Sequence, residues 1–401
     1  MNFSRYWIKE LPVEKLIAEH GSPLVIYSEA LLKEAYHAYK KAFPGAVIAY
    51  AMKANPLSAL LKIFLELGSS LEVVSGGEIE LARHCGFPPE RLIFNGNAKS
   101  PAELQTALDL GLRFNLDFSG EIQQVKKLNG GVVPETCGLR VNPEVEAGAI
   151  DIIKTAVPGA KFGTPVDEVE KLLETEKIKI SRISYHLGSQ ITDLTAYTTA
   201  LEKVIVLIEK LKTQGQPITD LDLGGGLGIP YRQNEGAPTI REYGEILQPR
   251  LENAALKLIL EPGRSLVGAA GTIITKVLYV KKVKNCNWAF LDTGSHILPR
   301  EAYLNWYHEI ILLRENLDNE TISYHLGGPL CFSGDQIARD YTLPCLKPGD
   351  KLAILHCGAY TTDMQNNYCS KLAPAHVLAK DQEFKLARRA QTPTDLWQYD
   401  L

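Results

Sequence analysis

The sequence predicts an α/β protein made of a closed barrel of eight β/α units and a second, antiparallel β domain. Between about residues 45 and 265, a short apolar run, a polar turn and an amphipathic stretch follow one another eight times. The apolar runs are nearly continuous, which is typical of parallel strands that are covered on both faces. After residue 264, strand-like runs continue while helical spacing becomes rare. This change marks the expected second domain.

Each of the eight apolar runs has the length and composition of one buried strand. The runs are Val47–Ala54, Leu71–Ser75, Leu92–Asn97, Arg113–Asp117, Gly138–Pro143, Ile183–Ser189, Leu221–Gly226 and Lys257–Gly263. The stretches between them place apolar residues at helical spacing, as in Leu57, Leu61 and Phe64. A count of eight favours a closed TIM-type barrel, and an open doubly wound sheet is the alternative.

The second domain is expected from strand-like runs that turn residues separate. These runs are Thr272–Val283, Trp288–Leu291, Ile322–Leu326 and Lys351–His356. They predict an antiparallel β-barrel, which the early run Pro23–Ser28 is expected to join. We therefore expect a barrel domain at 29–264 and a β domain built from 1–28 and 265–401. The long irregular stretch 143–162 is expected to act as a lid over the barrel mouth.

The bulk composition limits the classes of function. The 401 residues are 45% hydrophobic and 22% charged with a formal net charge of -4, so no basic field favours nucleic acid or a membrane surface. No apolar run is long enough to span a bilayer. The seven cysteines are scattered and form no CxxC pair, which indicates reduced thiols in a cytoplasm. We expect neither a disulfide framework nor a metal site.

In an eightfold barrel, functional residues lie at the C-terminal ends of the strands. Lys53 ends the first run, and a lysine held in a pocket can form a Schiff base with an aldehyde cofactor. The alternative is a lysine whose amine reaches solvent past an apolar surface. His186 ends the sixth run, where it could lie against a cofactor ring. A core histidine with satisfied hydrogen bonds is its ordinary alternative.

A glycine run follows the seventh strand. Gly224, Gly225 and Gly226 lack a Cβ, so their backbone N–H groups can approach a phosphate closely. The loops after the seventh and eighth strands are the usual phosphate site of such barrels, and Arg264 follows the eighth. With the strand-end lysine and the carboxylate of Glu261, these residues predict a pyridoxal 5'-phosphate (PLP) site.

The strand-end carboxylate also indicates the type of reaction. Glu261 can hold a proton on the pyridine nitrogen of PLP, which strengthens the ring as an electron sink. An arginine at this place would leave the nitrogen unprotonated and would suit racemisation better. Glu261 therefore favours decarboxylation.

Sequence motifs along nearly the whole chain resemble those of the fold-type III PLP-dependent decarboxylases. The matching segments are Tyr50–Asn55, Ser75–Glu78, Arg140–Pro143, Lys161–Gly163, His186–Ser189, Asp222–Gly228, Glu261–Ser265, Gly328–Cys331 and Gly358–Tyr360. Within this family of ornithine, arginine and diaminopimelate decarboxylases, the chain is most similar to the diaminopimelate decarboxylases. The resemblance implies an alanine racemase-like barrel, PLP as the cofactor, an amino acid as the substrate and a homodimer.

The resemblance also implies roles for individual residues. Lys53 would carry the cofactor, His186 would stack on its ring and Glu261 would pair with its nitrogen. The cofactor site would consist of Lys53, Arg140, His186, Ser189, Gly224, Gly225, Gly226, Glu261, Arg264 and Tyr360. Relatives are head-to-tail dimers, so Cys331 of the partner subunit would return a proton to the substrate carbon. Substrate contacts are expected from Arg264, Arg300, Phe332 and Tyr360.

Phe332 departs from the family pattern. Diaminopimelate decarboxylases follow the cysteine with a glutamate whose carboxylate pairs with the ammonium at the far end of the substrate. A buried charge left unpaired costs on the order of several kcal/mol, and a cation–π contact with a phenyl ring recovers only roughly 1 to 2 kcal/mol. Arg264 and Arg300, which would bind a distal carboxylate, are retained.

Two substrate hypotheses follow. The chain is either a diaminopimelate decarboxylase in which another residue supplies the missing carboxylate, or a specificity variant. The variant's substrate would keep a distal acid without a free distal ammonium, as a conjugated or carrier-bound amino acid does. An amino-acid racemase and a non-catalytic PLP-binding homologue are further alternatives. Glu261 argues against the first of these, and Lys53 with Cys331 argues against the second.

Overall fold

The computed structural model describes residues 7–148, 151–252, 254–315 and 320–400. The chain divides into two compact units. The β unit comprises Met1–Leu32, Pro230–Glu235 and Val267–Leu401, and the barrel unit comprises Lys33–Ile229 and Gly236–Leu266. Residues 1–6, which belong to the expected β domain, lie outside the described residues. The short segment Pro230–Glu235 groups with the β unit although barrel strands precede and follow it in sequence.

The eight expected parallel strands are present and close into a barrel. They are β2 (Val47–Ala51), β3 (Ser70–Val73), β4 (Leu92–Phe94), β5 (Arg113–Leu116), β6 (Gly138–Asn142), β8 (Arg182–Ser184), β9 (Asp220–Asp222) and β10 (Lys257–Leu260). Each strand pairs with the next in sequence order, and the pairing of β10 with β2 closes the ring. The two-residue β7 (Thr164–Pro165) adds to β6 outside the ring. The closed barrel is confirmed, and the open sheet is excluded.

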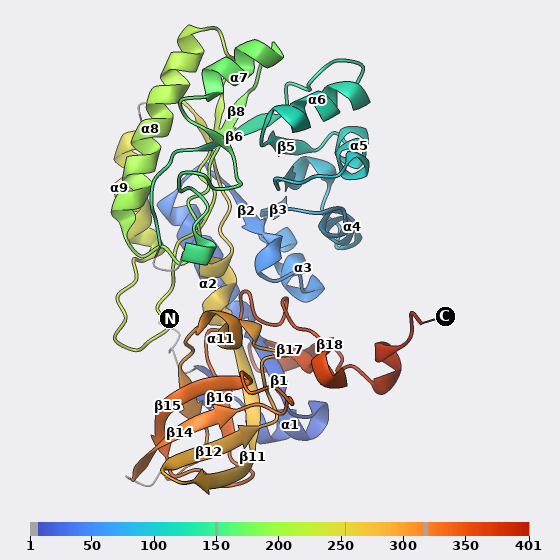
Figure 1. Ribbon diagram of the computed structural model, residues 1–401, viewed down its shortest axis with the longest axis vertical. Coiled ribbons are helices and arrows are strands. Elements are labelled where there is room, and N and C mark those ends of the chain that lie inside the picture. Colours follow the sequence, from blue (N-terminus) through green and yellow to red (C-terminus); the bar gives the residue numbers. More distant parts are fainter. Residues whose placement is uncertain (1–6, 149–150, 253, 316–319, 401) are drawn as a thin grey trace. The chain divides into compact units, whose positions relative to one another are not determined.

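Helices α3 to α9 are arranged around these strands (Figure 1). The barrel helices are α2 (Glu29–Ala42), which begins in the β unit, α3 (Ser58–Glu66), α4 (Gly76–His84), α5 (Pro101–Asp109), α6 (Ser119–Leu128), α7 (Val169–Glu176), α8 (Leu194–Thr213), α9 (Ile240–Leu251) and α10 (Arg264–Val267). Their starts are set by local sequence: Ser100 with Glu103 and Thr239 with Glu242 form capping boxes at α5 and α9. Such caps satisfy N–H groups that the first helical turn leaves free.

The β unit contains one nine-stranded sheet. Its strands are β1 (Leu24–Ser28), β11 (Gly271–Val283), β12 (Cys286–Leu291), β13 (Ile310–Leu312), β14 (Thr321–Gly327), β15 (Gln336–Pro344), β16 (Lys351–Ile354), β17 (Ala375–Lys380) and β18 (Glu383–Arg388). Its helices are α1 (Val13–His20) and α11 (Pro299–Leu304). Both units also contain short 3-10 helices, at Trp7–Glu10, Met52–Ala54, Pro89–Arg91, Asp151–Ile153, Gly268–Ala270, Tyr368–Ser370 and Pro393–Leu396.

The sheet of the β unit is mixed, which corrects the expectation of a purely antiparallel β-barrel. The early strand β1 does join it, but β1 pairs with β17 in parallel, and β12 pairs with β14 in parallel. Parallel neighbours need a crossover connection rather than a hairpin. Almost the whole chain lies between β1 and β17, and α11 with β13 lies between β12 and β14. The described strands run from β15 to β18 as an open path, with β16 and β13 branching from β11.

The core of the β unit packs around β1. Leu24 and Ile26 lie in one cluster with Ile274 of β11 and Val377 of β17, and each of these side chains is fully buried. Among the described residues, no helix is both long and apolar enough to cross a membrane.

Candidate active site

A cavity of about 380 Å³ lies at the C-terminal ends of the barrel strands. Four of the residues that the sequence predicts for the cofactor line it: Lys53, Arg140, His186 and Glu261. Lys53, His186 and Glu261 follow β2, β8 and β10, and Arg140 lies within β6, so only closure of the barrel brings the four together. The strand-end rule therefore predicted residues that the structure brings together around one cavity.

Lys53 lies in the single turn that follows β2. Its side chain is 37% exposed, so its amine is accessible from the cavity and not sealed in the core. The amine forms an ion pair with the carboxylate of Glu72, which is itself almost completely buried. A lysine held beside a buried carboxylate has a place to leave its proton when it becomes a nucleophile.

The floor of the cavity contains a group of buried carboxyl groups. Asn95 Nδ2 donates to Glu261 Oε1 at 2.7 Å and to Glu72 Oε1 at 3.3 Å. Burial raises the pKa of Glu261 well above its ordinary value, and the neighbouring carboxylates of Asp222 and Glu72 raise it further. Burial also raises the pKa of Asp222. The site thus holds more carboxyl groups than it can ionise together, which fits the protonated ring nitrogen of PLP against Glu261.

His186 is fixed with its ring neutral. Its Nδ1 accepts a hydrogen bond from the Gly225 N–H at 3.1 Å, so the ring proton lies on Nε2. Burial lowers the pKa of His186 well below its ordinary value, and the positive charges of Arg140 and Lys53 lower it further. A neutral imidazole can lie flat against a pyridine ring without placing another charge in the cavity.

The glycine run packs against neighbouring strand ends. A Cβ on Gly224 would lie 2.4 Å from the Tyr185 carbonyl oxygen, and one on Gly225 would lie 2.2 Å from that of Glu261. The N–H of Gly224 is bonded to Asp222 Oδ1 at 2.9 Å, and that of Gly225 is bonded to His186. Packing therefore already requires these glycines, and two of their three N–H groups have partners within the barrel.

Ser189 and Arg264 are far apart in sequence but meet in the structure. Nε and Nη2 of Arg264 lie 3.2 and 3.0 Å from the Ser189 hydroxyl oxygen. Arg264 is only 4% exposed, so its charge is held in place by its surroundings. A fixed guanidinium beside a hydroxyl group is a suitable pair of donors for a phosphate.

The irregular stretch 143–162, of which residues 149–150 lie outside the described residues, contributes to the cavity wall. Thr155 and Phe162 line the cavity, and the guanidinium of Arg140 lies 4.6 Å above the Phe162 ring. Thr155 Oγ1 donates to the carbonyl oxygen of His186 at 2.7 Å. Gly188 allows this close contact, because a Cβ there would lie 2.8 Å from the Ile153 carbonyl oxygen.

The remaining candidate residues belong to the β unit. Arg300 lies in α11 and is buried, whereas Cys331 and Phe332 are exposed on the loop between β14 and β15. Tyr360 has a left-handed backbone with φ of 54°. The loop that carries Cys331 is held by Asp335, whose carboxylate accepts the N–H of Leu330 at 2.7 Å.

Sequence reasoning missed the inward-facing polar residues Glu72 and Asn95. Both belong to apolar runs that were interpreted as buried strands, and both are buried beside Glu261. The sequence does contain a signal for this polar group, namely Glu72 itself, because a glutamate between Leu71 and Val73 in a buried strand requires a partner.

The comparison with known families decides the identity of this site. A family model described as "Pyridoxal-dependent decarboxylase, pyridoxal binding domain" matches residues 29–268. The chain belongs to the pyridoxal-dependent decarboxylases. Within this family it is 37% identical over 391 residues to the diaminopimelate decarboxylase of Aquifex aeolicus, covering 96% of this chain and 93% of that one. The diaminopimelate decarboxylase of Neisseria meningitidis serogroup B is 36% identical over 394 residues, covering 96% and 94%.

A solved structure of similar form supports the same conclusion. The diaminopimelate decarboxylase of Helicobacter pylori, complexed with L-lysine, superposes with a TM-score of 0.91 at 31% identity, covering 96% of this chain and 98% of that chain. The pyridoxal-dependent decarboxylase described here is thus an enzyme, a carboxy-lyase that uses PLP on an amino acid. The expected eightfold barrel, the cofactor and the class of reaction are confirmed.

Proposed function

We propose that Lys53, Glu261 and His186 carry the cofactor chemistry of this decarboxylase. The observation that supports this proposal is their position around one cavity: an accessible lysine, a buried carboxyl group and a neutral imidazole. When bound, PLP supplies an electron sink that lets the bond between the substrate's α-carbon and its carboxylate break. The residues of the chain have to bind the cofactor, orient it and move protons.

Each of the three residues has one task. Lys53 would hold the cofactor through its Nζ atom, and the Glu72 carboxylate, its ion-pair partner, can take up the proton that this amine has to release. Glu261 would keep a proton on the ring nitrogen, because burial and the neighbouring carboxylates raise the pKa of its carboxyl group and so favour a proton at this place. His186 supports one face of the ring and is kept in place by the Gly225 N–H.

The other predicted residues complete the reaction. Arg264 with Ser189 and the Gly224–Gly226 run binds the phosphate, and Tyr360 assists it. Arg140 forms a wall with Phe162.

The thiol of Cys331, supplied by a second copy of the chain, donates the proton that replaces the carboxylate. A homodimer is therefore part of the proposal, and a monomeric mass by light scattering of the active enzyme would contradict it. The seven free thiols suit a reducing cytoplasm.

The proposed substrate carries a distal acid but no free distal ammonium. Phe332 replaces the glutamate that would pair with an ammonium, and its side chain is 39% exposed within the β unit. An amino acid conjugated at its distal amine, or presented on a carrier, would place uncharged atoms at this ring. A diaminopimelate decarboxylase with a substitute carboxylate remains the alternative.

Two nearby carboxylates are not available as that substitute. Asp335 accepts the N–H of Ser295 at 2.6 Å with one oxygen and the N–H of Leu330 at 2.7 Å with the other. Glu301 lies 2.8 Å from the imidazole of His308, and both side chains are buried. Neither carboxylate could leave its partner without a cost of about 1 to 3 kcal/mol or more. This supports the specificity variant.

The role of Lys53 is tested by trapping the cofactor. PLP-loaded protein is reduced with borohydride, digested and analysed by mass spectrometry. We expect the pyridoxyl mass on the peptide that contains Lys53, and we expect Lys53→Ala to bind PLP without a reducible bond. Lys99→Ala is the matched control, because Lys99 lines the same cavity. Pyridoxyl mass on Lys99 or on no lysine would refute the assignment.

A further inference from the structure

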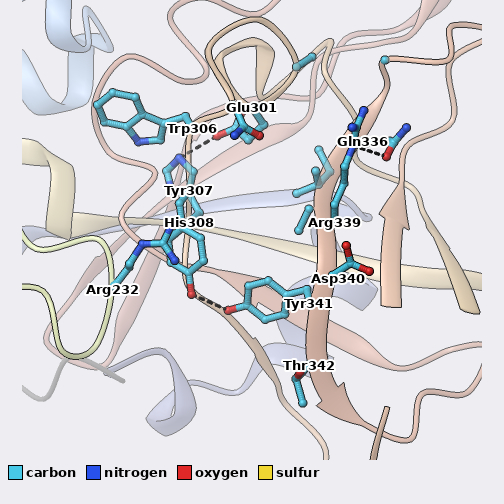
Figure 2. A pocket seen from close by; sticks show the side chains of 15 residues that line it. Arg232, Glu301, Trp306, Tyr307, His308, Gln336, Arg339, Asp340, Tyr341 and Thr342 are labelled. Carbon is cyan, nitrogen blue, oxygen red and sulfur yellow. Dashed lines mark hydrogen bonds and ion pairs between the residues drawn. The ribbon is translucent and has the colours of Figure 1, made fainter. Parts of the chain in front are cut away.

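The β unit contains a cavity of about 890 Å³ that the cofactor site does not use (Figure 2). Most polar side chains of its wall are paired with one another. The Tyr307 and Tyr341 hydroxyl oxygens lie 3.2 Å apart, Arg339 Nε donates to Gln336 at 2.8 Å, and the Arg232 guanidinium lies 3.8 Å above the Tyr307 ring. This pairing does not select a ligand. One buried charged pair of the wall lies beside a predicted substrate residue, Arg300.

That pair is Glu301 with His308. The His308 Nε2 atom lies 2.8 Å from Glu301 Oε1, and both side chains are at least 98% buried (Figure 2). On its other side, His308 Nδ1 lies 2.7 Å from the carbonyl oxygen of Leu355, which can only accept a proton. Nδ1 therefore carries a hydrogen, and Nε2 faces the Glu301 carboxylate. The pair connects α11 to the chain just after β16.

Helix α11 depends on such contacts for its placement. It has only six residues, its N-cap Leu298 provides no side-chain cap, and it ends at the left-handed Asn305. A helix this short has little stability of its own, so tertiary contacts determine its position. Glu301 joins α11 to His308, whose ring in turn contacts the chain just after β16.

Arg300 precedes Glu301 and points in another direction, since successive helical residues are about 100° apart. Its Nη2 donates to the Ala359 carbonyl oxygen at 3.0 Å, and its guanidinium lies 4.4 Å above the Trp306 ring. Arg300 is 4% exposed, yet its Nε and Nη1 atoms have no hydrogen-bond partner within the described residues. Buried donors without partners are costly, and an anion would satisfy them.

We propose that the Glu301–His308 pair is a positioning device for Arg300. By fixing α11, it holds the two unpartnered guanidinium nitrogens in place for the distal carboxylate of the substrate. The pair thereby sets how strongly the enzyme prefers substrates with a distal acid. The inference rests on the substrate role proposed above for Arg300. It assigns to Glu301 and His308 an effect on specificity and none on the chemical step.

The test compares two amino acids that differ only in the distal group. The probes are 2-aminopimelate, which has a distal carboxylate, and 2-aminoheptanoate, which has a methyl group instead, each as both enantiomers. Carbon dioxide release gives KM and kcat, and the change in absorbance of bound PLP gives a dissociation constant without turnover. The variants are Glu301→Gln, His308→Gln and Arg300→Met. Asp340→Asn is the control, because Asp340 lines the same cavity outside the pair.

We expect Glu301→Gln and His308→Gln to raise KM and the dissociation constant for 2-aminopimelate about 10-fold to 100-fold. Values for 2-aminoheptanoate and the kcat for both probes should change little, which distinguishes positioning from general damage to the fold. Asp340→Asn should behave as wild type. If either Glu301→Gln or His308→Gln fails to fold, the other variant is sufficient for the test, because each removes one side of the pair.

Two results would overturn the inference in different ways. If Arg300→Met abolishes the preference for 2-aminopimelate while both pair variants keep it, the positioning role is wrong and the substrate role of Arg300 stands. If the wild type, with PLP bound, does not distinguish the two probes, the substrate role of Arg300 is wrong. The positioning role of the Glu301–His308 pair is then wrong as well.

Discussion

At the residue scale, the proposed chemistry depends on a group of buried acids beside one lysine. Burial raises the pKa of Glu261 well above the ordinary range, and the neighbouring carboxylates of Asp222 and Glu72 raise it further. A proton at Glu261 would be shared with the ring nitrogen of bound PLP. Lys53, with Glu72 as its ion-pair partner, lies at the other side of this group.

Replacing Glu261 should impair the chemical step more than cofactor binding. Glu261→Gln removes the acid that keeps the ring nitrogen protonated, so we expect kcat to fall about 100-fold while PLP still binds. Asp222→Asn removes a charge that raises the pKa of Glu261, so we expect a smaller loss of the same kind. Carbon dioxide release at saturating substrate, with the absorbance of bound PLP as the control, measures both effects. A Glu261→Gln enzyme with wild-type kcat would contradict the role.

The residues that sequence reasoning could find are those at strand ends. Lys53, His186 and Glu261 each follow an apolar run, so the barrel rule places them at one mouth. Glu72 and Asn95 lie within or directly after such runs, where alternating inward and outward positions cannot be assigned from a single sequence. Their hydrogen-bond and ion-pair partners belong to other strands or to the turns that follow them, and lie beside them only when the barrel closes.

At the element scale, strand identity could be predicted but pairing in the β unit could not. Apolar runs revealed β1 and β11, yet nothing in the sequence indicates that β1 lies between β11 and β17 with opposite senses of pairing. That arrangement depends on contacts between residues several hundred positions apart. Strand β17 was not predicted, and it places His376 in the core 5.9 Å from the Tyr27 ring.

His376 makes the β unit sensitive to acid. Burial, together with the charge of Arg388, lowers its pKa to about 3, whereas the unfolded chain has an ordinary value near 6.5. Between these values the unfolded state binds more protons, so the free energy of unfolding falls as the pH falls from about 6.5 to 3. Each pKa unit is worth about 1.4 kcal/mol, so the effect amounts to several kcal/mol.

The contribution of His376 can be measured by urea unfolding at several pH values. We expect His376→Leu to reduce the loss of stability between pH 7 and pH 4.5, because the group that would have to charge in the unfolded state is gone. His84→Gln, which changes an exposed histidine, should leave the pH dependence as in wild type. If wild type and His376→Leu lose the same stability over this range, the buried neutral state of His376 is wrong.

At the scale of the whole molecule, the reaction class of the family is combined with a substrate specificity that we propose to be altered. The barrel and its cofactor residues follow the family, and relatives match over more than nine-tenths of the chain. The exposed ring of Phe332 stands where the family pattern has a carboxylate, on a loop that Asp335 holds in shape. The reaction could be predicted from sequence, while the substrate depends on groups whose spatial arrangement no motif describes.

The most direct test of the account measures kcat/KM by carbon dioxide release for meso-diaminopimelate, its mono-N-acetyl derivative and 2-aminopimelate. The wild type and Phe332→Glu are compared, both loaded with PLP. The account predicts that the wild type prefers the two substrates without a free distal ammonium, and that Phe332→Glu shifts the preference toward meso-diaminopimelate. Wild-type turnover of meso-diaminopimelate with kcat/KM of about 10⁴ M⁻¹s⁻¹ or more, unimproved by Phe332→Glu, would contradict it.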